Sequence, residues 1–217
     1  MTDVNDSGDG LWGRPDDSDF TYVVKVPGTN EEVSLTAVQD REICAGTPAF
    51  PSHGHCVWDA ALLLADYLQT EAGEDGQATC KFQFKGKKVV ELGAGVGLVG
   101  MALAVLGAEV VVTDQEYALP LLAKNVDTCS RLASWKKSVD VVVFSDVLYH
   151  ASAFLLLIET LHELVSPTSD VFFSFETRNE SIEANFLQQL GNTFDVEEYP
   201  DELFIYHARL KAGSNDK

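Results

Sequence analysis

Hydrophobic positions divide most of the chain into short continuous runs and longer helix-like stretches. Runs rich in β-branched residues, of the kind found in buried strands, occupy 89–92, 109–113, 140–145 and 171–175. Stretches with helical composition occupy 57–68, 96–106, 117–126, 151–165 and 182–190. Strands therefore alternate with helices, and this order predicts β-α-β units and a doubly wound, Rossmann-like α/β sheet.

Two further pairs of runs predict hairpins at the ends of this series. Residues 20–26 and 33–38 alternate and flank Pro-Gly-Thr-Asn at 27–30, which is typical of a turn. Residues 194–199 and 204–208 form the second pair. The sequence thus predicts an N-terminal β-hairpin added to the sheet and a C-terminal antiparallel hairpin that closes it.

The junction between the strand at 89–92 and the next helix carries the first candidate chemistry. Here the chain breaks from Val-Val-Glu-Leu directly into Gly93, Ala94 and Gly95, which allow the backbone to approach a ligand closely. Asp114 ends the following strand, about 20 residues after the first glycine, where a carboxylate can bind ribose hydroxyls. Together these features predict half of a nucleotide site.

Two kinds of nucleotide compete for this loop. Residues 95–100 match G-x-G-x-x-G, the dinucleotide fingerprint, but the first glycine after the strand is Gly93, from which that spacing fails. The better description is E-x-G-x-G-x-G, with Glu91 inside the motif. A carboxylate repels a pyrophosphate, whereas it does not repel the α-ammonium and sulfonium of S-adenosylmethionine. Charge favours the methyl donor, although glycine loops after strands are common.

Polar residues at several strand ends are expected to form one site. Ser145 and Asp146 end the strand at 140–145, and Gly93 and Asp114 end two others. Ligands of doubly wound sheets bind at the carboxyl ends of the strands. Only about a dozen residues, 127–139, separate the second crossover helix from the next strand, so a third core strand is predicted to be shortened or missing.

Composition and charge narrow the domain organisation and the partners. The 217 residues are 46% hydrophobic, enough to bury one substantial core. Residues 1–18 are acidic and rich in Asp, Gly and Ser, which predicts a disordered tail, and 19–217, with the hairpin at 20–40, are expected to form a single domain. The net charge of −19 disfavours a nucleic-acid substrate, and a basic protein segment could be attracted to it.

Cysteine spacing and hydropathy indicate a soluble protein of the cytoplasm. The four cysteines form no C-x-x-C pair, and the N-terminus carries no apolar signal, so reduced thiols are expected. No apolar run approaches the roughly 20 residues that cross a bilayer, which predicts no membrane partner. His53, His55 and Cys56 lack a fourth ligand at zinc spacing, so we expect a loop here and no metal.

With these motifs the chain resembles the class I, seven-stranded methyltransferases, and among them the protein-lysine group called methyltransferase family 16. The resemblance covers most of 55–210. It rests on Val-Trp-Asp-Ala-Ala at 57–61, the glycine loop, Thr-Asp at 113–114 and Asp-Val-Leu-Tyr at 146–149. The D-x-x-Y after the fourth core strand is the feature that separates this group from other class I methyltransferases.

Finer features resemble particular members of the group. The front hairpin, Gly-His-Cys-Val-Trp at 54–58 and Glu-Thr-Arg at 176–178 are most similar to the members that act on valosin-containing protein. Members that act on heat-shock chaperones are nearly as similar. The resemblance therefore implies a protein-lysine methyltransferase, expected to act as a monomer on an AAA ATPase of the valosin-containing type or on a heat-shock chaperone.

The resemblance also implies roles for individual residues. S-adenosylmethionine would be the cofactor, held at its methionine end by the glycine loop and at its ribose by Asp114. Trp135 would flank the adenine, although it could equally be an ordinary half-buried aromatic residue. The cofactor-binding residues implied in this way are Trp58, Glu91, Gly93, Ala94, Gly95, Asp114, Trp135 and Ser145.

Asp146 and Tyr149 are the expected catalytic residues. Lysine has a pKa near 10.4, yet it must be neutral to accept a methyl group. By resemblance, Asp146 would hold the incoming ammonium and Tyr149 would narrow the channel, with proton loss to water rather than to a general base. Alternatively, Asp146 caps the following helix and Tyr149 packs on the sheet.

Two functions of other classes compete with lysine methylation. The short segment at 127–139 is consistent with a catalytically weak or inactive, truncated methyltransferase-like binding module. An oxidoreductase that uses NAD is the third hypothesis, and the sequence offers no obvious partner for hydride transfer.

Overall fold

The computed structural model describes residues 17–26, 28–44, 53–69, 71–72, 78–79, 82–126, 139–199 and 204–212. At its centre lies a sheet whose described strands run in the order β6-β5-β7-β8-β10-β9. They are β5 (Lys88–Leu92), β6 (Glu109–Thr113), β7 (Val141–Ser145), β8 (Asp170–Ser174), β9 (Phe194–Glu198) and β10 (Ile205–Leu210). The first four strands are parallel, and β10 is antiparallel to both β8 and β9. The predicted Rossmann-like sheet with a C-terminal antiparallel hairpin is confirmed.

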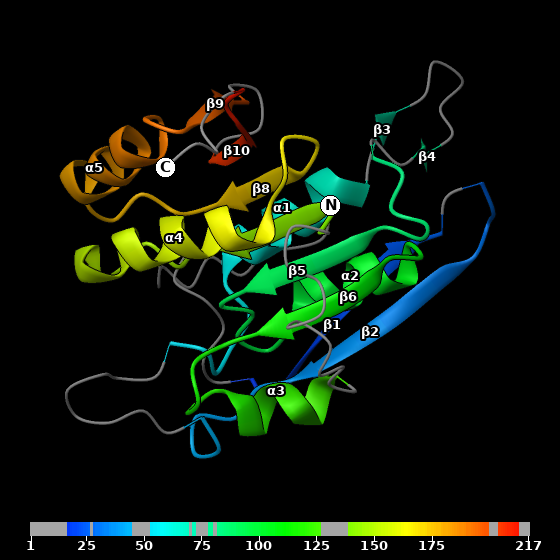
Figure 1. Cartoon of the computed structure of the whole chain (residues 1–217). Helices are drawn as coiled ribbons and strands as arrows, with labels where there is room; N and C mark the ends of the chain where they lie inside the picture. Colours follow the sequence, from blue (N-terminus) through cyan, green and yellow to red (C-terminus); the bar gives the residue numbers. More distant parts are fainter. Residues whose placement is uncertain are drawn as a thin grey trace, which may run out of the picture.

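Helices cover both faces of this sheet (Figure 1). On one face α1 (Asp59–Gln69) and α2 (Leu98–Val105) pack into one hydrophobic cluster. On the other, a second cluster contains the buried sides of α4 (Phe154–Leu164) and α5 (Glu180–Leu190). A short 3-10 helix, η2 (Ala151–Ala153), leads into α4. These two layers of helix are the doubly wound arrangement that alternating strands and helices predict.

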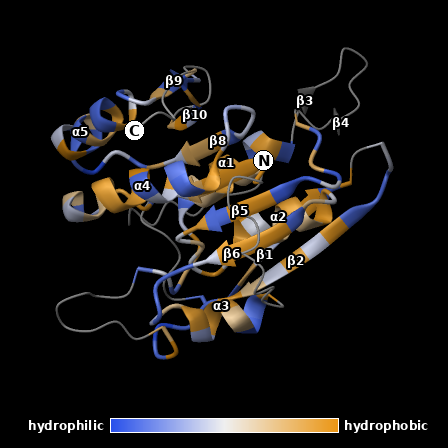
Figure 2. Ribbon diagram, in the orientation of Figure 1, coloured by the Kyte–Doolittle hydropathy of each residue, from blue (hydrophilic) through white to orange (hydrophobic). Residues whose placement is uncertain are grey.

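Burial on both faces explains the composition of the central elements. β7 is buried from Val141 through Phe144, so a continuous apolar run is favoured over an alternating one. The sequence of α2 is hydrophobic on nearly every side, and Figure 2 shows the helix orange along most of its length. A helix of that kind is stable only where it is enclosed, here between the sheet, α1 and the N-terminal hairpin.

The N-terminal hairpin is confirmed and packs on the same face as α2. β1 (Asp19–Lys25) pairs with β2 (Glu32–Val38), and Val24 and Ala37 enter the core cluster. The hydroxyl of Tyr22 donates a hydrogen bond of 2.6 Å to Asp66 of α1. Asn125, the last residue of α3 (Leu119–Asn125), accepts from the amide of Val38 at 2.8 Å. The hairpin is therefore attached to the domain by polar contacts as well as by apolar ones.

One region departs from the expected elements, and another is not tested. Between the predicted elements at 57–68 and 89–92 lie two paired strands of two residues each, β3 (Glu71–Ala72) and β4 (Ala78–Thr79), which the sequence did not predict. Residues 127–138, where a third core strand was in doubt, lie outside the described residues, and in the described sheet β6 is an edge strand. No described helix combines the length and apolar character needed to cross a bilayer.

Candidate functional site

The carboxyl ends of β5, β6 and β7 open onto a cavity of about 280 Å³. Its walls come from the segment before α1, the loop after β5, the ends of β6 and β7, and the segment after β8. β6, the next strand in sequence, lies on one side of β5, and β7 lies on the other side. The strand order therefore reverses at β5, and the cavity lies at this topological switch point. Ligands of doubly wound folds bind at this position.

The glycine loop forms one wall of the cavity with little more than backbone. Gly93 has φ +66° and Gly95 has φ +55°, in the left-handed region that favours glycine. A Cβ atom on Gly93 would lie 2.6 Å from Cγ1 of Val147. The amide of Ala94 donates to the carbonyl of Thr113 at 2.9 Å, which fixes the loop against the end of β6. The wall is therefore shaped for a ligand that lies directly against the main chain.

Asp114 occupies the adjoining corner of the cavity. Its Oδ2 accepts from the amide of Gly95 at 2.6 Å, and its Oδ1 accepts from the amide of Gln115 at 2.7 Å. Burial raises the pKa of its carboxyl above the usual value, and the two amide donors act against this rise. The carboxylate is thus held at the end of β6, beside the glycine loop, as expected for a group that binds ribose hydroxyls.

Glu91 lies behind the glycine loop rather than in the cavity wall. Only 2% of the residue is exposed, and its Oε2 accepts from the amide of Gly100 in α2 at 2.7 Å. A Cβ on Gly100 would lie 2.6 Å from that oxygen, so the glycine is what permits the contact. Burial raises the pKa of Glu91 to about 8. In this structure the carboxyl supports the start of α2, and its direct contact with a cofactor stays a prediction.

At the end of β7, on another part of the cavity wall, Asp146 forms a two-pronged ion pair with Arg178. Nη1 of Arg178 contacts Oδ1 of Asp146, and Nη2 lies 2.6 Å from Oδ2. Asp146 has φ +57°, and its amide donates to the carbonyl of Ser174 at 2.9 Å. The residue that precedes η2 as its N-cap is His150, which makes no side-chain cap bond. The helix-cap alternative for Asp146 is wrong, because its carboxylate faces the segment after β8.

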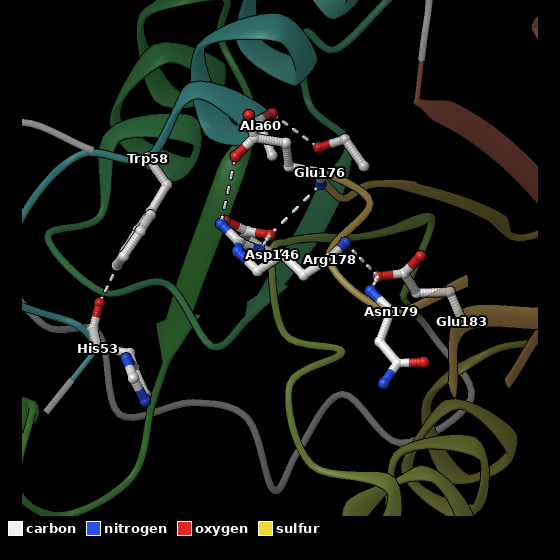
Figure 3. Close-up of polar contacts among 9 residues, drawn as sticks. His53, Trp58, Ala60, Asp146, Glu176, Arg178, Asn179 and Glu183 are labelled. Carbon is white, nitrogen blue, oxygen red and sulfur yellow. Dashed lines mark hydrogen bonds and ion pairs between the residues drawn. The ribbon is translucent and has the colours of Figure 1, made fainter. Parts of the chain in front are cut away.

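Trp58 completes this wall from the entrance of α1 (Figure 3). Its indole Nε1 donates to the carbonyl oxygen of His53 at 2.7 Å, which fixes the ring. The guanidinium carbon of Arg178 lies 5.3 Å from the ring centroid, within the range of a cation–π contact. The aromatic ring, the guanidinium and the carboxylate of Asp146 therefore follow one another along the wall.

Tyr149 stands at the mouth of the cavity, 38% exposed. Its ring centroid lies 4.9 Å from that of His53 and 5.0 Å from that of His150. Burial, reinforced by the neighbouring Tyr117 and Asp114, raises the pKa of its phenol well above the usual range. Burial also lowers the pKa of His53, with His150 and Arg178 adding to the effect. Tyr149 is therefore a neutral phenol at physiological pH, and it lines the cavity.

The structure brings together most of the predicted site residues. The cavity is lined by Trp58, Gly93, Ala94, Gly95, Asp114, Ser145, Asp146 and Tyr149, from elements far apart in the sequence. Glu91 lies behind the loop, and Trp135 is outside the described residues. Of the three residues considered as metal ligands, His53 and Cys56 line the cavity. The described residues contain no group of three or more potential ligands placed to hold a metal ion.

Sequence reasoning assigned no role to several lining residues. Tyr117, Val147 and Arg178 all face the cavity. Arg178 follows β8, a strand of the same parallel set, so the strand-end rule that selected Asp114 and Ser145 also covers it. No sequence signal indicates that its partner is Asp146, 32 residues earlier.

Comparison with known proteins identifies the family. The profile of the lysine methyltransferase family matches residues 42–193. The chain belongs to this family. Protein N-lysine methyltransferase METTL21A of Danio rerio is 37% identical over 182 residues, covering 73% of this chain and 78% of that protein. EEF1A lysine methyltransferase 3 of Xenopus tropicalis is 35% identical over 151 residues. That match covers 62% of each chain, so the chain spans less than two thirds of that relative.

Solved structures agree with the fold of the family. The chain of the 16S rRNA methyltransferase RsmC from T. Thermophilus, solved with AdoMet and guanosine, matches with a TM-score of 0.51. It is 18% identical, and the match covers 90% of this chain and 51% of that one. The fold is that of a methyltransferase solved with AdoMet, and the family is that of the lysine methyltransferases, as predicted. The relatives support protein-lysine methylation without supporting the finer resemblance to members that act on valosin-containing protein.

Proposed function

We propose that this chain transfers a methyl group from S-adenosylmethionine to a lysine side chain of a cytosolic protein. One observation carries the proposal: a single cavity at the switch point is lined both by the glycine loop with Asp114 and by Asp146 with Tyr149. The first pair suits a nucleoside-bearing cation, and the second suits a cationic side chain entering from solvent. Donor and acceptor would thus meet in the same cavity.

The donor side fits S-adenosylmethionine in shape and charge. Gly93, Ala94 and Gly95 offer main chain with no side chain to fill the space, and Asp114 offers a fixed carboxylate to ribose hydroxyls. A second cavity of about 340 Å³ also borders Gly93 and Asp114, which leaves room beside the ribose position for a base. When bound, this cofactor supplies an electrophilic methyl group on a positively charged sulfur.

The acceptor side would orient the lysine and exclude water. Asp146 offers a carboxylate to the ammonium, and its own side chain is only 6% exposed. Tyr149, at the mouth, would enclose the aliphatic part of the lysine, and Trp58 would exclude water from the far side. Neither tyrosine nor carboxylate is assigned as a base, because the phenol has a raised pKa and the carboxylate is already paired. The proton would leave to water.

Three substrate classes follow from the resemblance and the relatives. The sequence resemblance favours an AAA ATPase of the valosin-containing type or a heat-shock chaperone. One relative is named for its action on EEF1A, which adds elongation factor 1A as a candidate. We place the AAA ATPase and the chaperone first, with the chain acting in the cytoplasm as a monomer.

The direct test incubates the purified chain with methyl-labelled S-adenosylmethionine and each of the three purified candidates. We expect label on a lysine of one of these proteins, located by mass spectrometry. Asp114→Asn is the matched control, because it removes the carboxylate proposed to bind the ribose and should abolish labelling at low donor concentration. Label confined to small molecules would contradict the proposal.

The competing function is a binding module without catalytic activity. Its basis is the short connection between Val126 and Val139, where other class I methyltransferases carry a third strand. Isothermal titration calorimetry with S-adenosylmethionine separates the two functions. Micromolar binding supports the enzyme, whereas binding that is millimolar or absent favours the module.

A further inference from the structure

Arg178 lies beside Asp146 on the proposed acceptor side of the cavity. Its guanidinium is paired with the carboxylate of Asp146 in the absence of substrate. Both carboxylate oxygens of Asp146 are in contact with the guanidinium, one of them at 2.6 Å. The side chain of Arg178 is 28% exposed, against 6% for that of Asp146. An incoming lysine ammonium must therefore share the carboxylate with the guanidinium.

Three further contacts hold Arg178 in place from other directions. Its guanidinium lies over Trp58, and its Nη2 lies 3.4 Å from Oε2 of Glu176. Its main-chain amide donates to Oε1 of Glu183 at 2.8 Å, and Figure 3 shows Glu183 on the side of Arg178 away from Trp58. The guanidinium thus keeps an aromatic face and a second carboxylate if it gives up one contact with Asp146.

The carboxylates around Arg178 have two opposed effects on a substrate lysine, and the guanidinium of Arg178 offsets one of them. Asp146 and Glu176 face the guanidinium directly, and Asp59 acts on Glu176 from α1. Carboxylates alone would capture a lysine but would also stabilise its ammonium, which cannot accept a methyl group. A fixed cation beside the same carboxylate opposes the charged form of the lysine.

We infer, resting on the proposed function, that Arg178 is a positioning residue that shares Asp146 with the substrate lysine and remains beside the lysine nitrogen. The lysine is captured as a cation through Asp146 and Glu176. It then loses its proton to water, because the neighbouring guanidinium destabilises the second positive charge. No bond of Arg178 is made or broken in this step.

Other titratable groups surround the ion pair, and they are common to the variants compared. The groups that act on Asp146 or Arg178 from the surrounding elements are Glu176, Glu183, His53 and Tyr149, and Asp59 acts on Glu176. Burial raises the pKa of Glu176 and of Tyr149, and it lowers the pKa of His53. Glu91, with a pKa of about 8, lies behind the glycine loop and is common to all variants compared.

The test is the pH dependence of kcat between about pH 6 and 10, which reports groups in the enzyme–substrate complex. The wild type is compared with Arg178→Lys, which keeps the charge, and Arg178→Gln, which removes it. The substrate is whichever purified candidate accepts label. We expect Arg178→Gln to move the rising inflection up by about one pH unit, Arg178→Lys to leave it near the wild-type position, and Asp146→Asn to move it down.

Two controls keep the inference falsifiable. If Arg178→Gln does not fold, Arg178→Met replaces it, because its apolar stem still packs on Trp58 without a charge. In the absence of donor, thermal unfolding of Asp146→Asn, Arg178→Gln and the double variant measures the coupling of the pair. We expect the double variant to lose less Tm than the sum of the two single losses.

The outcomes separate the inference from the proposed function. Rates that fall uniformly without a moved inflection, or Tm losses that simply add, overturn the role of Arg178 while methylation by the wild type stands. Absence of protein methylation by the wild type overturns the proposed function and the inference with it.

Discussion

At the scale of single residues, Asp146 combines two roles: it pairs with Arg178, and it is proposed to bind the substrate lysine. It was expected to capture the lysine, and it is already bound to Arg178. Both statements are compatible if the carboxylate serves two cations, since a carboxylate offers about four acceptor positions and the guanidinium occupies only part of them. Pairing with Arg178 then leaves acceptor positions on Asp146 for the substrate ammonium.

Replacing Asp146 by asparagine should reduce turnover without loss of the fold. The isosteric amide removes one charge-assisted contact with the substrate, of about 1.5–3 kcal/mol, which corresponds to roughly a tenfold to hundredfold lower kcat/KM. Donor affinity, measured by calorimetry, should stay near the wild-type value. Asp195→Asn, at an exposed position of β9, is the matched control and should change neither quantity. Equal kcat/KM in Asp146→Asn and wild type would remove Asp146 from the mechanism.

Substitutions at Gly93 and Gly95 test whether the glycine loop forms the binding surface for S-adenosylmethionine. Alanine at either position must adopt a left-handed conformation, which costs about 1–2 kcal/mol. At Gly93 the new Cβ would also lie 2.6 Å from Val147, whereas at Gly95 the nearest atom lies 3.5 Å away. We therefore expect Gly93→Ala to weaken S-adenosylmethionine binding more than Gly95→Ala, as measured by calorimetry. The reverse order would show that the steric contact at Gly93 is not what shapes the wall.

The sequence predicts site residues well where one rule applies and poorly where tertiary contacts decide. Asp114 and Ser145 could be placed from strand ends alone, because parallel strands bring their carboxyl ends to one edge. Glu91 could not be oriented, since β5 is buried on both faces and its residues show no inward–outward alternation. The partner of Arg178 depends on how the segments after β7 and β8 lie together, which no local pattern encodes.

At the scale of elements, hydrophobic patterning predicts nearly all helices and strands of the sheet. The core strands are buried runs, and α4 and α5 carry one buried side each, so the patterns are strong. The pair β3 and β4 was missed because strands of two residues are too short to show a period. The attachment of the N-terminal hairpin to α1 and α3 rests on single polar contacts, such as Tyr22 with Asp66, that periodicity does not reveal.

The junction of β5 with α2 should make stability depend on pH through Glu91. Its pKa rises from 4.5 to about 8 on folding, because the carboxyl is buried. Between these values the folded chain keeps a proton that the unfolded chain has released, so unfolding is favoured as pH rises. This contribution to stability is present below about pH 4.5, decreases by at most about 1.4 kcal/mol per pH unit, and levels off above about pH 8.

Glu91→Gln should flatten this dependence. The amide oxygen can still accept from Gly100, and there is no proton to release. We expect the Tm of the wild type to fall more between pH 5 and 8 than that of the variant, measured by circular dichroism. A residual slope is expected, because the pKa of Asp114 is also raised. Glu197→Gln, at an exposed position of β9, should retain the wild-type slope, and parallel slopes for all three proteins would contradict the assignment.

At the scale of the whole molecule, charge and topology act on different parts of the function. The parallel topology brings the glycine loop, Asp114 and Asp146 to the same edge of the sheet. The net charge of −19 instead acts on encounter, because it repels anionic partners and attracts basic ones from a distance. Acidic groups near the cavity, among them Glu176 and Asp59, extend this field to the site itself.

Long-range attraction predicts that salt weakens capture of a basic protein segment without slowing methyl transfer. Raising the salt from about 20 to 200 mM shortens the screening length from roughly 20 Å to below 10 Å, which removes most of the contribution from distant charges. We expect KM for the protein substrate to rise several-fold across this range while kcat stays constant, because contacts inside the cavity are screened much less. Steady-state kinetics at fixed pH and saturating donor measure both. A substrate whose methylated segment is acidic serves as the comparison and should show an unchanged or lower KM. If KM for the basic segment does not respond to salt, the acidic surface serves solubility and takes no part in recognition.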